Sequence, residues 1–410
     1  MSFDVQHIRA DFPVLAEIIN GQPLVYLDSA NTSQKPNAVI NAMTTFMQHA
    51  YGPTNRSAYK LASDATDAFE GARAKVAAFI NAPAVHEVVF TKNATESLNL
   101  IVRTWGTQNL SKGDVVVLTH MEHHANIVPW QMLAAEKGFT IRWVPLTHDG
   151  LLDLSDLDTL LAGAKAFSFT AMSNVLGTIN PVKELCARAH KHGAIAIVDG
   201  CQSVPHMHTD VQEWDADFVV FSSHKMVGPS GIGIMWGREK ILDAIPPFLG
   251  GGNMISDVKL EGFTCAELPA KFEAGTQPII EAIGLGAAVD YLSALGMHNV
   301  RQHERDITRY ALDTLTARFG DDIVIHGSRN VEVRGATLSF AFRDVHPHDV
   351  SQVLDQHNVC VRAGHHCAKP LMRLLGANAT VRASFYLYNT PSEVDALGDA
   401  LAEAGDFFTL

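Results

Sequence analysis

The chain has 410 residues, more than a single hydrophobic core usually serves, so two domains are expected. Hydrophobic residues make up 47%, enough to bury a large core, and the formal net charge of −13 argues against binding to nucleic acid or to an anionic membrane. Charged residues make up 18%, below the roughly 25% of typical soluble domains, which indicates that some apolar surface is buried against another subunit.

The first residues do not have the composition of a secretory signal. Residues 1–20 carry Asp4, Asp11 and Glu17 and lack a basic start followed by an apolar run. No apolar run elsewhere is long enough to span a bilayer. Five cysteines without regular spacing favour free thiols over a disulfide framework. We therefore expect a cytoplasmic protein without a membrane partner, in which any special cysteine is reactive rather than structural.

Short apolar runs alternate with segments of helical pattern in the first half of the chain. Strands are predicted at 24–27, 87–90, 115–119, 140–145, 166–170, 194–198 and 217–221. Helices are predicted at 3–18, 37–50, 94–105, 154–161 and 181–192. This alternation is typical of an α/β domain with a mostly parallel sheet.

Three polar residues near strand ends are candidates for ligand contacts. Thr95 follows a strand and a tight turn at a helix start, where free backbone N–H groups can hold an anion, although a plain helix-capping role would give the same local structure. Asn174 comes just past strand 166–170 and can contact a ligand or hold a turn. His123 lies in a histidine-rich run that lacks the ligand spacing of a zinc signature, so we expect no metal.

The stretch 194–233 holds an acid and a lysine at two successive strand ends. Asp199 directly follows strand 194–198, at the carboxyl edge where open α/β sheets bind ligands. Lys225 follows strand 217–221 and could form a Schiff base if its amine loses its proton. An aspartate for the pyridine nitrogen and a lysine for the aldehyde suit pyridoxal 5'-phosphate. A strand-capping aspartate and a solvated lysine are the alternative.

The pattern changes in the last third of the chain. A helix is predicted at 279–295, followed by strands at 323–326 and 336–342 and helices at 348–357 and 391–404. We expect a large domain over 24–290 and a smaller α+β domain formed by 1–23 and 291–410. Cys367 lies on a predicted loop of this second domain, and Arg382 on a strand-like run, where a guanidinium could clamp an amino-acid carboxylate.

Several motifs carry a resemblance to a known family. They are YLDSANTSQKP from Tyr26, EHHANIVPW from Glu122, VDGCQSVPHMH from Val198, FSSHKMVGPSGIG from Phe221, FEAGTQP from Phe272, VCVRAGHHCAKP from Val359 and VRASFYLYNT from Val381. Together they resemble the class V aminotransferase-like enzymes, and among these the group II, SufS-type cysteine desulfurases. The resemblance implies the type I fold of pyridoxal-phosphate-dependent transferases, with a mostly parallel sheet in the large domain.

The resemblance also implies roles for individual residues. It implies that Thr95, Ser222 and His224 bind the cofactor phosphate and that Thr276 binds the phosphate of a partner subunit. It implies that Asp199 binds the pyridine nitrogen, that Asn174 and Gln202 contact the ring hydroxyl, and that Lys225 bonds to the aldehyde carbon. His123 is expected to stack on the ring and to take part in catalysis. Arg382, Asn174, Arg362 and Arg56 are expected to contact substrate, and Cys367 is the sulfur-accepting nucleophile. The chain departs from the family pattern at Asn55 and at Ser223, where relatives usually carry histidine and glycine.

The expected activity is that of a cysteine desulfurase. Such an enzyme converts L-cysteine to L-alanine, leaves a persulfide on Cys367 and supplies sulfur for iron–sulfur cluster assembly. The resemblance further implies a homodimer and a sulfur acceptor of SufE or SufU type. Three alternatives stay open at this point: a selenocysteine lyase acting on L-selenocysteine, an aminotransferase or epimerase of the same superfamily, and a non-catalytic scaffold in a sulfur-transfer assembly.

Overall fold

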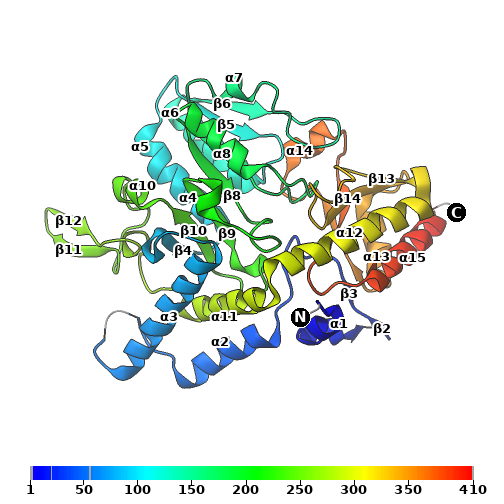
Figure 1. The fold of residues 1–410 in the computed structure, drawn as a ribbon, viewed down its shortest axis with the longest axis horizontal. Coiled ribbons are helices and arrows are strands. Elements are labelled where there is room, and N and C mark those ends of the chain that lie inside the picture. The colour runs from blue at the N-terminus through cyan, green and yellow to red at the C-terminus, as the bar shows by residue number, and fades with distance from the viewer. Residues whose placement is uncertain (1–2, 20, 55–56, 409–410) are drawn as a thin grey trace.

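A seven-stranded sheet forms the centre of the larger part of the molecule (Figure 1). The structure is a computed structural model that describes residues 3–19, 21–54 and 57–408. The strand order is β4 (Val88–Thr91), β10 (Gly233–Gly237), β9 (Phe218–Ser222), β8 (Ile195–Asp199), β7 (Ala164–Thr170), β5 (Val115–Thr119) and β6 (Thr140–Val144). β10 alone runs in the direction opposite to the other six strands, so the prediction of a mostly parallel sheet is confirmed.

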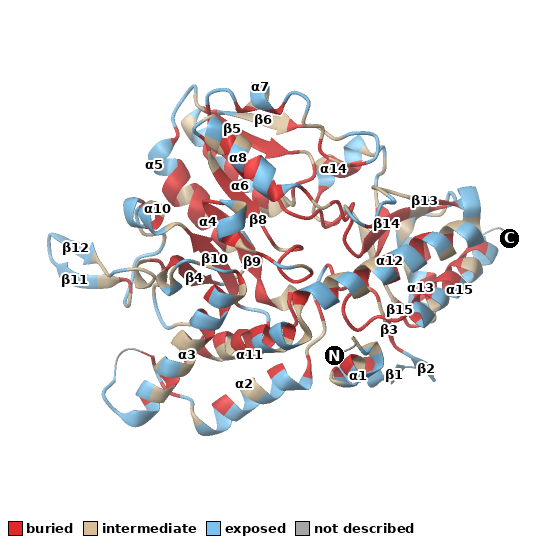
Figure 2. Cartoon of the chain, in the orientation of Figure 1, coloured by how far each residue is buried: buried red, intermediate tan, exposed pale blue. Residues whose placement is uncertain are grey.

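Helices cover both faces of this sheet. Successive side chains of a strand point to opposite faces, and both sets are apolar here. Val115 and Val117 belong to the same apolar core as helices α3 (Lys60–Phe79), α8 (Val182–Lys191) and α11 (Ile279–Leu295). Val116 and Leu118 belong instead to the core shared with α4 (Ala94–Ile101) and α6 (Val128–Lys137). Figure 2 shows the strands buried between these helical layers, except for the edge strand β6, which is mostly of intermediate burial.

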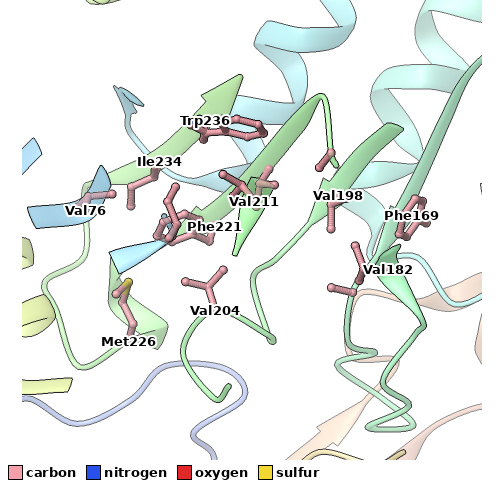
Figure 3. Close-up of a cluster of buried hydrophobic side chains, with 14 of the residues drawn as sticks. Val76, Phe169, Val182, Val198, Val204, Val211, Phe221, Met226, Ile234 and Trp236 are labelled. Carbon is pink, nitrogen blue, oxygen red and sulfur yellow. The ribbon is translucent and has the colours of Figure 1, made fainter. Parts of the chain in front are cut away.

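The strands next to the candidate site are fixed by dense apolar packing (Figure 3). Val198, Phe221 and Ile234 lie on the neighbouring strands β8, β9 and β10 and are fully buried. Val204 and Met226, from the loops that leave β8 and β9, belong to the same core. The ends of these strands are therefore held rigidly, which is what a binding site at their carboxyl edge needs.

A smaller unit lies beside the large one (Figure 1). Its sheet has the order β13 (Ile323–Ile325), β14 (Thr337–Phe342), β17 (Thr380–Ser384) and β16 (Arg362–Gly364). Helices α13 (Pro347–Gln356) and α15 (Pro391–Phe408) pack on it, together with the second half of α12 (Met297–Phe319). A short parallel pair joins β3 (Val25–Tyr26) to β15 (Val359–Cys360).

The remaining elements are short or peripheral. They are α1 (Val5–Ala10), β1 (Ile18–Ile19), β2 (Gln22–Pro23), α2 (Asn37–His49), α5 (Thr107–Asn109), α7 (Leu157–Leu161), α9 (Val211–Trp214), α10 (Glu239–Ala244), β11 (Ile255–Lys259), β12 (Gly262–Cys265) and α14 (Lys369–Leu374). β11 and β12 form a hairpin that projects from the side of the large unit opposite the small one (Figure 1). No single helix in the described ranges is long and apolar enough to cross a membrane; α11 together with the helix that follows passes that test only as a pair bent by 74°.

The division into two domains stays a prediction, and the cores show where the chain passes between the two units. Val25 and Leu27 pack in the core of the small unit, although they fall inside the range expected for the large domain. Along α12, Met297 and Val300 belong to the large core, whereas Ile307 belongs to the small one. The passage therefore lies inside a continuous helix, between residues 300 and 307.

Candidate functional site

The carboxyl ends of β7, β8 and β9 open into a cavity of about 270 Å³. Each of these strands contributes one lining residue at its end, respectively Thr170, Asp199 and Ser222. The small unit supplies three more, Arg362, Cys367 and Arg382. The cavity also includes Ala30, Asn31, Asn93, Ala94, Thr95, Leu98, His123, Ala125, Met172, Asn174, Cys201, Gln202, His224 and Lys225.

One end of the cavity has the form of an anion site. Asn93 caps helix α4, its side chain accepting the Glu96 N–H, and Ser222 Oγ accepts the Ala94 N–H at 2.9 Å. The positive end of the helix thus faces this part of the cavity, where Thr95 is exposed. Gly233 is required behind it, because a Cβ there would lie 2.4 Å from the Asn93 Cα. β10 can therefore approach the helix start only with glycine at this position.

The buried acid of the cavity is Asp199. Its carboxylate accepts the Cys201 N–H at 2.9 Å, and only 4% of the residue is exposed. Gln202 is also buried and donates from Nε2 to the Ala30 carbonyl at 2.7 Å, which ties the cavity to the N-terminal strand segment. Burial raises the pKa of the Cys201 thiol well above its ordinary value, with a further contribution from Asp199.

A short segment of the N-terminal region fixes the turn that carries Lys225. The His224 carbonyl accepts from Ser33 N at 3.0 Å, from Ser33 Oγ at 3.1 Å and from Lys35 Nζ at 2.9 Å. Ser33 Oγ also accepts the Val227 N–H at 2.9 Å, and Val227 has a φ of 57°, which is costly for a β-branched residue. Burial lowers the pKa of Lys35 to about 7. Contacts from outside the turn thus hold Lys225 in place.

His123 is neutral at physiological pH. Burial and, to a smaller extent, the charge of Lys225 lower its pKa to about 4. Its Nδ1 accepts the Ala125 N–H at 3.1 Å, so the ring proton lies on Nε2. The preceding residue, Glu122, is fully buried beneath the cavity wall and accepts from Thr119, from Asn126 and from the Thr170 N–H. Burial raises the pKa of Glu122 to about 8.

Arg382 joins the two units at the cavity. Its guanidinium is buried, donates to the Asn174 carbonyl at 3.0 Å and pairs with Asp28 at 3.1 Å. Nε is buried as well and has no partner among the described residues. Burial lowers the pKa of Arg382, and Asp28 opposes that effect. The contacts to Asn174 and Asp28 use two of the five N–H donors of the guanidinium, so it is suited to an anionic group entering the cavity.

Cys367 lies on a loop with an unusual backbone. His366 and Cys367 have φ values of 52° and 57°, and Gly364 has 129°. Arg362 Nη2 lies 3.7 Å from Cys367 Sγ, while its Nη1 donates to Asn31. The thiol, two guanidinium groups and Lys225 therefore line one cavity, although they come from segments far apart in the chain.

Eleven of the thirteen predicted site residues line the cavity. They are Thr95, His123, Asn174, Asp199, Gln202, Ser222, His224, Lys225, Arg362, Cys367 and Arg382. Thr276 is exposed and is not among the lining residues, and the prediction for Arg56 lies outside the described residues. The individual roles of these residues stay predictions.

Other residues of the site were not predicted. Asp28, Asn31 and Lys35 lie in the motif YLDSANTSQKP, which was noticed without assigning them roles. Cys201, which has no predicted role, also lines the cavity. For Asp28 and Cys201 the signal available was their position close after a strand, the same signal that identified Asp199.

Comparisons with known proteins agree with this geometry. The family model for aminotransferase class-V matches residues 25–397. The chain belongs to the class-V aminotransferase family. Enzymes of this family are generally dependent on pyridoxal phosphate.

Full-length relatives of this class-V family member carry one activity in their names. A probable cysteine desulfurase of Streptomyces coelicolor is 49% identical over 411 residues, which cover 99% of this chain and 98% of the relative. The cysteine desulfurase CsdA of Escherichia coli has a TM-score of 0.91 at 36% identity and covers 99% of this chain and 100% of its own. A cysteine desulfurase of Thermococcus onnurineus has a TM-score of 0.93 at 38% identity, with 98% of each chain covered.

Proposed function

We propose that this protein is a pyridoxal-phosphate-dependent cysteine desulfurase that moves sulfur from L-cysteine to Cys367. The observation that carries the proposal is the shared cavity in which Cys367 and Arg382 of the small unit meet Lys225 and Asp199 of the large one. An aminotransferase or epimerase has no use for a thiol in this place. A scaffold without activity has no use for the buried acid and the lysine.

The residues of the cavity fit the cofactor chemically. The start of helix α4 with Ser222 and His224 offers donors for a phosphate group, and Gly233 lets β10 support this helix start at close range. The buried carboxylate of Asp199 suits a protonated pyridine nitrogen, and Gln202 is a polar neighbour for a ring hydroxyl. Lys225 supplies the amine, and neutral His123 supplies a flat ring that can lie against another. When bound, the cofactor draws electrons away from the α-carbon of an amino acid.

Arg382 is proposed to hold the substrate carboxylate. Arg382 lines the cavity, and Asp28 and the Asn174 carbonyl fix the plane of its guanidinium. A carboxylate placed on this fork directs the side chain of L-cysteine to a defined part of the cavity. Arg362 and Asn174 are proposed as further substrate contacts, as is Arg56.

Cys367 is proposed to accept the substrate sulfur. Its Sγ bonds to that sulfur as the Cβ–S bond of L-cysteine breaks, and the bonding electron pair stays with the carbon. The carbon then takes a proton, and the three-carbon remainder leaves as L-alanine. His123, neutral and carrying its proton on Nε2, can hold or pass a proton inside the cavity. The sulfur stays on Cys367 as a persulfide for an acceptor in iron–sulfur cluster assembly.

The proposal includes a twofold dimer and an acceptor protein of SufE or SufU type. The exposed position of Thr276, outside the cavity of its own chain, is compatible with a contact to the phosphate site of a partner subunit. Exposed apolar residues on and beside α2 and α3, such as Met47, Tyr51 and Leu61, offer surface for the same interface. Light scattering tests this point, since a fully active monomer would contradict it.

The activity is tested by incubating the purified protein with L-cysteine and measuring alanine and sulfide together. Alanine formed in step with sulfur release is expected. Cys367→Ser should keep the visible absorption of the cofactor and form no alanine from L-cysteine, whereas Lys225→Ala should lose that absorption. Near wild-type alanine formation by Cys367→Ser would reject Cys367 as the nucleophile. Turnover of L-selenocysteine by that variant would indicate a selenocysteine lyase.

A further inference from the structure

The loop that carries Cys367 has a backbone conformation that it does not favour by itself. His366 and Cys367 both lie in the left-handed region, at φ 52° and 57°, where non-glycine residues are uncommon. Two successive residues of this kind persist only where surrounding contacts hold them. The position of the thiol is therefore determined by contacts from outside the loop.

Two residues of the large unit contact the backbone of this loop. Asn174 Nδ2 donates to the His366 carbonyl at 2.7 Å. His124 makes two contacts, since its backbone N–H donates to the Cys367 carbonyl at 2.7 Å and its Nε2 accepts the Lys369 N–H at 2.9 Å. The main chain and the side chain of His124 thus bracket Cys367. The second contact also reaches the start of α14, which lies between the two units (Figure 1).

The contact to Lys369 requires a neutral imidazole. Nε2 must offer a lone pair, so the ring proton is on Nδ1, and a doubly protonated ring has no acceptor left. The groups around this ring favour the neutral form. Burial lowers the pKa of His124, and Lys369 and His365 lower it further, while the ring of His123 lies 6.3 Å away between centroids. At neutral pH the hydrogen bond from the Lys369 N–H to His124 Nε2 is therefore formed.

We propose that His124 is a positioning residue for the nucleophile: its neutral imidazole holds the Lys369 end of the Cys367 loop, and protonation of that imidazole releases this end of the loop. The role of the held thiol rests on the proposed function, whereas the bracket itself is a property of the fold. Asn174 does not titrate, so its contact to His366 persists when the bracket opens. The backbone N–H of His124 does not titrate either and keeps its bond to the Cys367 carbonyl. Release is therefore a loosening at Lys369, directly after the nucleophile turn, and not a detachment of the whole loop.

Hydrogen–deuterium exchange of the loop tests the proposal on the protein with its cofactor bound. The Lys369 amide is followed from pH 8 to pH 5, after correction for the intrinsic pH dependence of exchange. One lost hydrogen bond corresponds to about a fivefold loss of protection. The wild type should show this loss as the pH falls. His124→Gln, which keeps an acceptor that does not titrate, should stay protected throughout, and His124→Leu should be unprotected at every pH.

His365→Gln serves as the matched control, because it removes a neighbouring titratable ring and keeps the bracket. Its exchange should follow the wild-type pH profile, shifted at most toward higher pH. The proposal is overturned if His124→Leu keeps full protection at pH 8, or if His124→Gln loses protection with the same profile as the wild type. Thermal unfolding at each pH identifies any variant that is destabilised as a whole. Because exchange requires no turnover, a failure to form alanine would reject the proposed function and leave this result standing.

Discussion

Replacing Arg73 by methionine should destabilise the protein far more than the same change two residues later on the same helix. Arg73 is buried in α3, donates to both oxygens of Glu273 at 2.6 and 2.9 Å, and also donates to the Val88 carbonyl. Burial alone would lower its pKa, but Glu273 and Glu70 raise it above the ordinary value of a guanidinium. Methionine keeps much of the apolar stem and removes the charge.

The size of the expected destabilisation follows from the unpaired carboxylate that Arg73→Met leaves at Glu273. Glu273 has a side chain only 6% exposed, and its remaining donor in the structure is the Phe90 N–H at 2.7 Å. Removing one partner of a buried ion pair costs about 3 to 5 kcal/mol. The matched control is Lys75→Met, which breaks the exposed pair with Asp290 and should cost less than about 1 kcal/mol.

Urea denaturation of the three proteins measures the difference. The double variant Arg73→Met/Glu273→Gln should recover part of the loss, because a neutral amide costs less to bury than an unpaired carboxylate. Glu273 lies three residues before Thr276. Arg73→Met should therefore also retain less cofactor if Thr276 contacts the phosphate of a partner subunit. An unfolding free energy for Arg73→Met within about 1 kcal/mol of Lys75→Met would refute the reasoning.

Three further outcomes are expected. Arg382→Lys loses the planar fork and should lower kcat/KM for L-cysteine about 10- to 100-fold in steady-state assays; unchanged kinetics would remove Arg382 from the substrate site. Because burial raises the pKa of Glu122 to about 8, the folded chain keeps a proton there that the unfolded chain loses above about pH 4.5, and this stabilisation disappears as pH rises to 8. Glu122→Gln should therefore gain stability relative to the wild type by up to about 1.4 kcal/mol per pH unit across that window in denaturation experiments, and a constant difference would contradict this. Ser223→Ala removes a buried hydroxyl without a partner among the described residues and should raise the unfolding free energy by about 1 kcal/mol; a loss of stability would show that the hydroxyl is used.

Regular elements with strong local signals could be predicted from the sequence. Strand 115–119 and helix 279–295 have the predicted bounds, the strand because of its continuous apolar run and the helix because Pro278 and Gly296 flank it. Two long helices were missed. α3 buries small residues such as Ala65 and Ala72, and α12 is largely polar and even buries Glu304, so neither shows a strong apolar stripe.

The site was predictable wherever a functional residue follows a strand, because parallel strands bring their carboxyl ends to one edge. Asp199 and Lys225 were found in this way. Contacts between the two units were not predictable, because they depend on how separate cores pack. The pair of Arg382 with Asp28 and the bracket of His124 around Cys367 belong to this class.

The parallel pairing of β3 with β15 has a consequence for folding during synthesis on the ribosome. Val25 pairs with Val359, so one of the first strands made waits for a partner synthesised about 330 residues later. At typical elongation rates this delay is roughly 20 to 60 seconds. The large unit can fold during that time, but Val25 and Leu27 remain without the core that finally covers them. A chain interrupted before residue 359 therefore carries Asp199 and Lys225 without the thiol, and exposes an apolar strand for chaperones to cover.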